Sequence, residues 1–432
     1  MELAIQRAGI RKLVLAGSIF FSAVVILESG KVWVADRRTG SLDPDEVARG
    51  AALLPQNGEA WDRLGHLVQW DLAHPNVSAA IQDYRQALQR DPLSAAFWMD
   101  LAGGYEQIGD TAEAREAFEH AKRVYPDSAE VAWNYGSFLL RQRDNPNAYA
   151  EINRAVSIDP SLLPLAISRS WRSGIGVDQL LDKALPQNSN AYLQALDFFS
   201  SAREPDAGLA VWKRLTVLKQ RIAIQRTFSF FDELVGEDRS EDVQRIWPQA
   251  FAAAGLPFES PTNNSLVWNG DLARDFSNGG LDWRWDPIPD VAIDFDSAPP
   301  GTPGRSVRLD FQGGTNLELH APAQYVPVLP NESYQFETQM RTEGITTESG
   351  LHFSIIDPNH PGRLNAQTID LTGSHSWARM ETTFKTGADT HFVLVRLLRN
   401  PSRLFENRLA GTVWFADVRL TPTKKGAPTP AP

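Results

Sequence analysis

Apolar and small residues in the first half of the chain recur with a period of 34 residues. Pro92, Pro126 and Pro160 share this spacing, and each follows a stretch with helical periodicity. Small residues let two helices approach closely, and proline closes a unit because it cannot continue a helix. The pattern therefore predicts helical hairpins stacked in a solenoid. Three further columns keep the same register: Ala80, Ala114 and Ala148; Ala87, Ala121 and Ala155; and the bulky Tyr84, Phe118 and Ile152.

Helical patterning continues beyond Pro160 in a less regular form. The next position in register is Gln194, so the proline column breaks there. Helical spacing nevertheless persists in NAYLQALDFFSS, AGLAVWKRLTVLK and SEDVQRIWPQAFAAAG. Because the terminal units of a solenoid are usually atypical, we predict an α-solenoid over residues 43–255 with irregular hairpins at its end.

The second half of the chain alternates between apolar and polar positions with a period of two. In SYQFETQMRT, apolar or small side chains on one side alternate with Gln, Glu, Gln and Arg on the other. Eight or more such short runs, separated by Gly, Pro and Asn turns, predict an antiparallel β-sandwich over residues 264–422. The other runs are VAIDFD, SVRLDFQ, NLELHA, LHFSIID, ARMETTFK, HFVLVRLL and GTVWFADVRL.

The two patterns are separated by residues 256–263, which overlap the aperiodic segment PFESPTNNS. We predict a linker here, so that the sandwich folds independently and little packing crosses the boundary. Residues 423–432 are predicted to be a disordered tail.

The N-terminus predicts a membrane segment over residues 1–34. Arg7, Arg11 and Lys12 precede the uncharged run LVLAGSIFFSAVVIL, which is shorter than the roughly 20 residues that span a bilayer but has apolar flanks. We expect an uncleaved anchor, because no small-x-small site follows the run; a cleaved signal peptide is the alternative. The preceding positive charges predict a single-pass inner-membrane protein whose bulk is periplasmic.

Composition narrows the classes of function. The net charge is −11, with acids and bases interspersed, which argues against nucleic-acid binding. The chain has no cysteine and therefore no thiolate site. No G-x-S-x-G, H-E-x-x-H or P-loop pattern is present, so we expect a protein that is not an enzyme. A pair of glycosidase carboxylates would leave no linear signature, which keeps the enzyme hypothesis open.

The upstream half of each repeat reads WDRLGHLV, FWMDLAGGY or AWNYGSFL. Residues 57–162 resemble the tetratricopeptide repeat family through these motifs and the 34-residue period. The resemblance implies a concave groove, lined by the first helix of each unit, that binds a protein or peptide. Family members that clamp a C-terminal carboxylate use Lys and Asn where this chain has Asp62, Met99 and Trp133. Groove candidates are Asp62, His66, Met99, Gly103, Glu106, Trp133 and Ser137; Trp133 packing within the stack is the alternative.

The predicted sandwich opens with LVWNGDLARDFSNGGLDWRW and closes with VWFADVRL. This pairing resembles jelly-roll carbohydrate-binding modules of the galactose-binding-like kind. The resemblance implies a site where an aromatic ring meets sugar C–H groups and planar polar side chains meet the hydroxyls. The alternative is that the tryptophans only pack in the core or rim. Candidates are Trp283, Trp285, Gln339, Arg341, His352, Trp377 and Arg396.

In the resembled modules a structural calcium often ties the first strand to the last. Asp271 and Asp417 fall in those places, and carboxylate oxygens suit the ion. A salt-bridge or turn role for both residues is the favoured alternative, and no other cofactor is expected.

The domain pairing predicts a non-catalytic, membrane-anchored envelope scaffold. Its repeats would bind a protein and its sandwich a polysaccharide, in the assembly or export of surface polysaccharide. The first alternative is a protein-assembly scaffold that binds no sugar. The second is a jelly-roll glycoside hydrolase or lyase, which rests on fold analogy alone.

Overall fold

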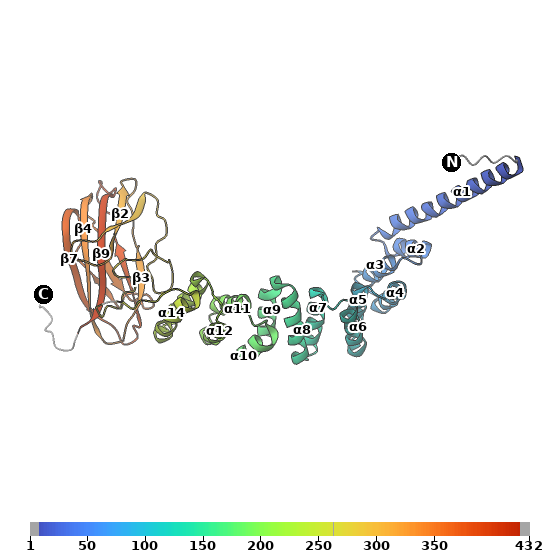
Figure 1. Ribbon diagram of the computed structural model, residues 1–432, viewed down its shortest axis with the longest axis horizontal. Coiled ribbons are helices and arrows are strands. Elements are labelled where there is room, and N and C mark those ends of the chain that lie inside the picture. Colours follow the sequence, from blue (N-terminus) through green and yellow to red (C-terminus); the bar gives the residue numbers. More distant parts are fainter. Residues whose placement is uncertain (1–7, 262, 424–432) are drawn as a thin grey trace. The chain divides into compact units, whose positions relative to one another are not determined.

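The computed structural model describes residues 8–261 and 263–423. Arg7, Thr262 in the predicted linker, and the predicted tail from residue 424 lie outside the described residues. Helices come first along the chain and antiparallel sheets follow, which confirms the predicted fold class (Figure 1). Contacts between residues divide the chain into two compact units, Met1–Pro186 and Gln187–Pro432.

Helical hairpins build the first unit. α3 packs against α4, α5 against α6, and α7 against α8, as the repeat predicts. Short irregular helices follow them. The elements are α1 (Ala8–Thr39), α2 (Pro44–Leu53), α3 (Gly58–Gln69), α4 (Val77–Arg90), α5 (Ala95–Gln107), α6 (Thr111–Val124), α7 (Ala129–Arg141), α8 (Asn145–Ile158), the 3-10 turn η1 (Pro160–Leu162), α9 (Leu163–Arg172), α10 (Val177–Gln179) and the π-helical turn η2 (Leu180–Ala184).

Polar side chains cap the first helix of each hairpin. Asn57, Ser94 and Ser128 precede α3, α5 and α7, and each accepts a hydrogen bond from a backbone N–H in the first turn. Ser94 and Ser128 are separated by the repeat length. The sequence period therefore includes the caps that start the helices as well as the prolines that follow them.

The small residues of the repeat lie at close helix contacts. The six alanines of the two predicted columns have no exposed surface. Gly65 lies so close to the ring of Tyr84 that a Cβ atom would stand 2.6 Å from Cε1, and a Cβ on Gly136 would stand 3.1 Å from Ile152. These contacts confirm the register inferred from the sequence.

α1 is the one helix of the described chain that is long and apolar enough to cross a membrane. The most apolar 18-residue window within Arg11–Thr39 has a mean hydropathy of 2.0, and none of that window is buried. The helix continues past the predicted segment, and its C-terminal end packs on α2, where Ala35 is buried and Gly50 approaches it. By length and composition α1 suits an anchor and a signal sequence alike.

The second unit begins with four further α-helices. The three helical segments recognised beyond Pro160 lie in α11, α12 and α14, whereas α13 was not predicted. α14 ends where Gly255 adopts a φ of 68°, a left-handed conformation that glycine allows at a helix C-terminus. The bounds are α11 (Ser189–Ala202), α12 (Pro205–Val217), the 3-10 turn η3 (Ile224–Thr227), α13 (Phe228–Gly236) and α14 (Ser240–Ala254).

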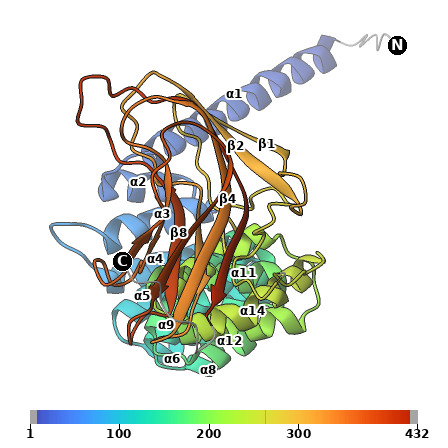
Figure 2. The ribbon, with the colours of Figure 1, turned by 90° about the vertical axis from the view of Figure 1, so that its left-hand side faces the viewer.

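Two antiparallel sheets form the sandwich. One has the order β1-β2-β9-β4-β7 and the other β3-β8-β5-β6. Figure 2 shows strands of both sheets, among them β4 of the first and β8 of the second. The strands are β1 (Val291–Ser297), β2 (Arg305–Gln312), β3 (Ala323–Pro327), β4 (Ser333–Ile345), β5 (His352–Ile356), β6 (Asn365–Gln367), β7 (Gly373–Lys385), β8 (Phe392–Leu398) and β9 (Ala410–Pro422).

Aromatic rings join the inner faces of the two sheets. The ring of Phe353 on β5 lies 5.3 Å from those of Phe336 on β4 and Phe415 on β9, measured between centroids. All three side chains are fully buried. The alternation read from the sequence thus places one side of each strand in a common core.

The expectation that little packing crosses residues 256–263 is wrong. The ring of Trp268, at the start of the sandwich, contacts Trp247 and Phe251 of α14 and stacks on Phe258 of the predicted linker at 4.7 Å. Gly280 also faces the ring of Trp247, where a Cβ would stand 2.1 Å away. The last helices and the sandwich therefore pack against each other through aromatic contacts.

Ala121→Trp is expected to lower the free energy of unfolding by about 1 to 3 kcal/mol or more, because overpacking forces neighbouring groups apart. Ala121 on α6 has no exposed surface. The measurement is the melting temperature of the helical circular-dichroism signal. Ala112→Trp, at an exposed position of the same helix, is the matched control. An equal melting temperature for both variants would contradict the register.

Candidate functional site

The predicted groove residues of the first unit lie on the first helices of successive hairpins. Glu106 of α5 binds Arg141 of α7 through two hydrogen bonds of 2.6 and 2.7 Å. Met99 of α5 accepts a 3.7 Å contact from the amide of Asn134 on α7. The structure therefore connects neighbouring repeats through the predicted residues, and it adds Arg141 and Asn134, which the sequence reading missed. Both follow their partners by 35 residues, one more than the repeat.

Two carboxylates and an imidazole meet at the junction of α3 and α5. Asp62 and His66 lie one turn apart on α3, and His66 Nε2 lies 3.8 Å from Asp62 and 3.2 Å from Asp100 of α5. Burial, followed by the charge of Asp100, raises the pKa of Asp62 to about 7. A hydrogen bond to Asp100 raises the pKa of His66. The donor atoms lie within 4.8 Å of one another, close enough to coordinate one cation.

Trp133 of α7 has a cationic neighbour. The guanidinium of Arg169 on α9 lies 5.0 Å from the centre of its ring, and the same arginine donates a 2.6 Å hydrogen bond to Ser137. Burial lowers the pKa of Arg169, and the nearby Arg141 adds to this effect. Carboxylates at α3 and α5 are thus followed along the repeats by guanidinium groups at α7 and α9.

Asp62→Asn is expected to raise the melting temperature at pH 8 but not at pH 4. Because the pKa of Asp62 is raised from 3.8 to about 7, its ionisation destabilises the fold as pH rises through this range. Asparagine cannot ionise, so its advantage appears only at the higher pH. Asp127→Asn, in the exposed turn before α7, is the control. An equal gain at both pH values would contradict the assignment.

Neither Trp283 nor Trp285 forms an exposed platform in the sandwich. Trp283 has no exposed surface, and its indole N–H donates to the backbone oxygen of Asn269 at 3.2 Å. Trp285 is 8% exposed and belongs to the same core. Neither of these two candidates therefore offers a ring to a sugar. The structure assigns both tryptophans to packing, the alternative that the sequence left open.

Gln339, Arg341 and Trp377 lie on the five-stranded sheet. Polar side chains on the outward face of this sheet mostly contact one another. Arg341 lies over the ring of Trp414 at 4.3 Å, and the indole N–H of Trp414 donates to Asp296 at 2.8 Å. Trp377 is half-buried on the edge strand β7.

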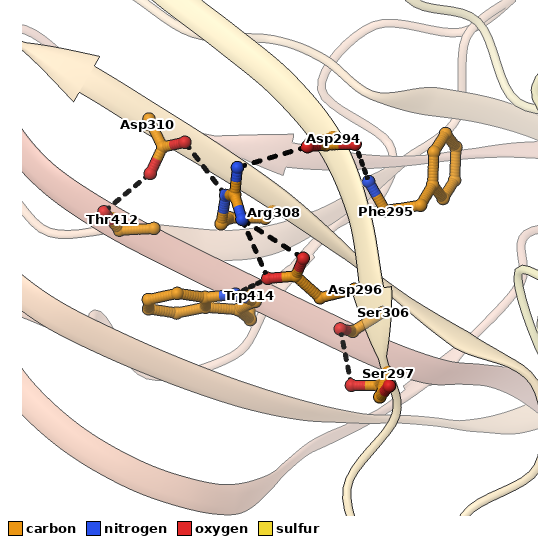
Figure 3. A network of polar contacts seen from close by, with 9 residues as sticks. All are labelled: Asp294, Phe295, Asp296, Ser297, Ser306, Arg308, Asp310, Thr412 and Trp414. Atoms are coloured by element: carbon orange, nitrogen blue, oxygen red, sulfur yellow. Dashed lines mark hydrogen bonds and ion pairs between the residues drawn. The ribbon is translucent and has the colours of Figure 1, made fainter.

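An arginine on this sheet holds the neighbouring acids. Arg308 pairs with Asp294, Asp296 and Asp310 at 2.9 to 3.2 Å, and Asp310 accepts a further hydrogen bond from Thr412 (Figure 3). This face therefore leaves few of its charged groups free for a ligand. The sequence reading missed Trp414 because its strand lies far from Arg308 and Arg341 along the chain.

His352 and Arg396 lie on the other sheet, and the structure brings them together. Phe353 and Ile355 of β5, like Val395 of β8, point into the core, so His352, Ser354 and Arg396 point outward. Ser354 is the direct cross-strand partner of Arg396 and, on its other side, of Gln367. A row of planar polar groups and a hydroxyl thus crosses three strands of the four-stranded sheet.

An aromatic and apolar row lies beside this polar row. Tyr325 of β3 pairs with Leu394 of β8, which pairs with Ile356 of β5. All three side chains are half-buried. Arg284 lies over the ring of Tyr325 at 5.0 Å. A ring and apolar surface beside planar polar groups is the arrangement that sugar binding requires.

Two buried polar side chains of this face carry atoms that make no hydrogen bond. Ser354 is 1% exposed, and its hydroxyl makes no hydrogen bond within the described chain. His352 is 3% exposed; its Nδ1 lies 2.5 Å from Asp370, but neither Nδ1 nor Nε2 makes a hydrogen bond within the described residues. Burial lowers the pKa of His352 and so favours the neutral ring. The sequence reading missed Ser354 and Tyr325, because only the strand pairing places them beside His352 and Arg396.

Asp271 and Asp417 line one cavity of about 430 Å³. Asp417 Oδ1 accepts a 2.8 Å hydrogen bond from Arg419, and Asp271 Oδ1 accepts one from the backbone of Ala273. Arg274 and Arg419 line the same cavity. Two guanidinium groups beside two engaged carboxylates fit a calcium ion poorly, so the residues present favour the salt-bridge and turn roles.

The chain thus combines helical repeats with a C-terminal β-sandwich. One family model matches part of the repeats. The tetratricopeptide repeat model matches residues 72–133. No curated protein matches the chain.

Solved structures resemble parts of the chain. The structure described as "Crystal structure of MamA protein" has 15% identity and a TM-score of 0.29, over 44% of this chain and 89% of that one. "CBM4 structure and function" has 14% identity and a TM-score of 0.27, over 36% and 99%. The tailspike protein 4 enzymatically active domain of bacteriophage CBA120 has 12% and 0.28, over 37% and 22%. Scores this low establish neither a shared function nor a shared ligand.

Proposed function

We propose that this protein is a non-catalytic, membrane-anchored envelope scaffold. Its tetratricopeptide repeats bind a protein partner, and its sandwich binds a glycan in the assembly or export of a surface polysaccharide. The observation that carries the glycan role is the outward face of the four-stranded sheet. There, buried polar groups without partners lie beside an aromatic and apolar row.

Burial without a partner is the physical reason to assign a ligand to this face. A buried hydroxyl or imidazole nitrogen that makes no hydrogen bond costs about 1 to 3 kcal/mol. Ser354 and His352 both carry such an atom. Sugar hydroxyls donate and accept at short range, and the ring of Tyr325 offers C–H contacts next to them. A glycan therefore supplies both kinds of contact that the face presents.

The charge distribution of the repeat groove supports the protein-binding role. Carboxylates of Asp62 and Asp100 lie at one end, and the guanidinium group of Arg169 lies further along the solenoid, whereas that of Arg141 is paired with Glu106. A peptide with basic and acidic side chains in the reverse order would match both ends. Electrostatic complementarity of this kind contributes mainly to specificity and to the rate of association.

A second candidate function is a protein-assembly scaffold that binds no sugar. The aromatic contacts of Trp268 with α14 favour it, because the sandwich closes the end of the last helical hairpins. In this case the sandwich would serve as a terminal cap, which repeat proteins require for solubility. The enzyme hypothesis has less support: the acids around Arg308 are held in ion pairs.

The anchoring role of α1 predicts that the protein stays in the membrane fraction after a high-salt wash. Its exposed apolar surface would otherwise remain in water. A reporter fused after Pro432 should be active outside the cytoplasm, since basic residues precede the apolar run. Recovery of a soluble, shortened chain would show cleavage instead, and a cytoplasmically active reporter would reverse the topology.

Binding of the full chain, held in lipid nanodiscs, to a broad panel of neutral and acidic polysaccharides tests the glycan role. We expect weak retention of at least one polysaccharide, and Tyr325→Ala should weaken it by roughly tenfold, the scale of a lost aromatic contact. Tyr125→Ala, an exposed tyrosine in the first unit, is the matched control and should bind normally. Failure to bind any polysaccharide would favour the protein-assembly scaffold, and release of reducing sugar would support the enzyme.

A further inference from the structure

Arg396 is a half-buried cation without a counter-ion. It makes no ion pair and no hydrogen bond within the described residues, and its Nε atom is shielded from solvent without a partner. Glu318 influences it electrostatically, but the carboxylate of Glu318 lies 2.7 Å from His320 instead. A guanidinium withdrawn from water in this way costs free energy unless a partner offsets it.

Other arginines of the sandwich show how unusual this is. Arg305, Arg363 and Arg419 each pair with a carboxylate at 2.8 or 2.9 Å. Arg399 is fully buried without a salt bridge, but it donates to the carbonyl of Ser349 and to the side chains of Asn316 and Thr347. Arg396 has neither kind of partner, although it lies only three residues before Arg399 in the chain.

The surroundings of Arg396 define what could approach it. Ser354, directly opposite on β5, offers a hydroxyl that can donate, and Gln367 offers an exposed amide on the next strand. His352 Nδ1 lies 2.5 Å from a carboxylate oxygen of Asp370, and Nε2, which has no partner among the described residues, can accept from a sugar hydroxyl when Nδ1 carries the proton. The ring of Tyr325 lies one row away.

From this geometry we infer that the glycan bound by the four-stranded sheet is acidic, and that the carboxylate of a uronic-acid residue sits on Arg396. The inference rests on the proposed glycan-binding function and names its ligand class. A guanidinium presents two parallel N–H donors that match a carboxylate, and Ser354 can donate to the same group. The hydroxyls and the C–H face of the uronate then meet His352 and Tyr325.

Because the chain has a net negative charge, binding of an acidic glycan requires a local positive charge. At −11, the protein repels polyanions on average, so a preference for an acidic glycan cannot come from general attraction. A cationic side chain whose N–H donors have no partner is required, and within the described part of the sandwich Arg396 is such a residue.

The test compares matched pairs of oligosaccharides on the full chain in nanodiscs, by isothermal titration calorimetry. Each pair is an oligouronate, of galacturonate or of mannuronate, and the same oligomer with its carboxylates methyl-esterified. We expect one acidic oligomer to bind at least about tenfold more tightly than its ester, as a charged hydrogen bond implies. Arg396→Gln should remove this difference. Arg379→Gln, on the other sheet, should leave it unchanged.

Each other outcome overturns the inference. Equal affinity for acid and ester would show that Arg396 does not bind a carboxylate. A preference for the acid that survives in Arg396→Gln would show the same. Binding of neutral polysaccharides alone would overturn the inference while leaving the glycan role intact, and absence of all glycan binding would remove both. The comparison of acid with ester on the unaltered chain needs no variant, so equal affinity for the two overturns the inference even if Arg396→Gln fails to fold.

Discussion

A single helical hairpin cannot bury its own apolar face, and this constraint organises the chain. In the repeats, each hairpin covers the next, with alanines and glycines setting how closely they approach. In the second unit the partner of the last helix is the sandwich itself. Trp247 and Phe251 of α14 pack on Trp268, so the helical pattern ends on a β-structure rather than on a polar capping helix.

The two outward faces of the sandwich differ in whether their polar groups are paired. On the five-stranded sheet, Arg308 gathers three carboxylates, and Trp414 is held by Asp296 beneath Arg341. On the four-stranded sheet, Ser354 and Arg396 face each other without a partner. Since an unpaired polar group in a protein interior is costly, the first face is complete as it stands and the second is the one that a ligand would complete.

The sequence predicted the fold class and the repeat register because both leave periodic signals. It also named His352 and Arg396, since alternation showed that they point away from the core. It could not show that they are neighbours, because β5 and β8 pair across a long stretch of chain. Alternation around Arg284 left open whether Trp283 packs in the core. The structure shows that it does, with the carbonyl of Asn269 accepting a hydrogen bond from its indole N–H.

The packing of α14 on the sandwich gives the proposed glycan face a structural link to the helices. Arg284 lies over the ring of Tyr325 and donates a 2.6 Å hydrogen bond to Asp232 of α13. Asn359, in the loop after β5, donates to Asp238 and to the carbonyl of Val235 at the end of the same helix. Both contacts join α13 to segments that flank the four-stranded sheet. A ligand on that sheet would therefore rest on a surface whose position is fixed by the last hairpins, because the two share hydrogen bonds as well as aromatic contacts.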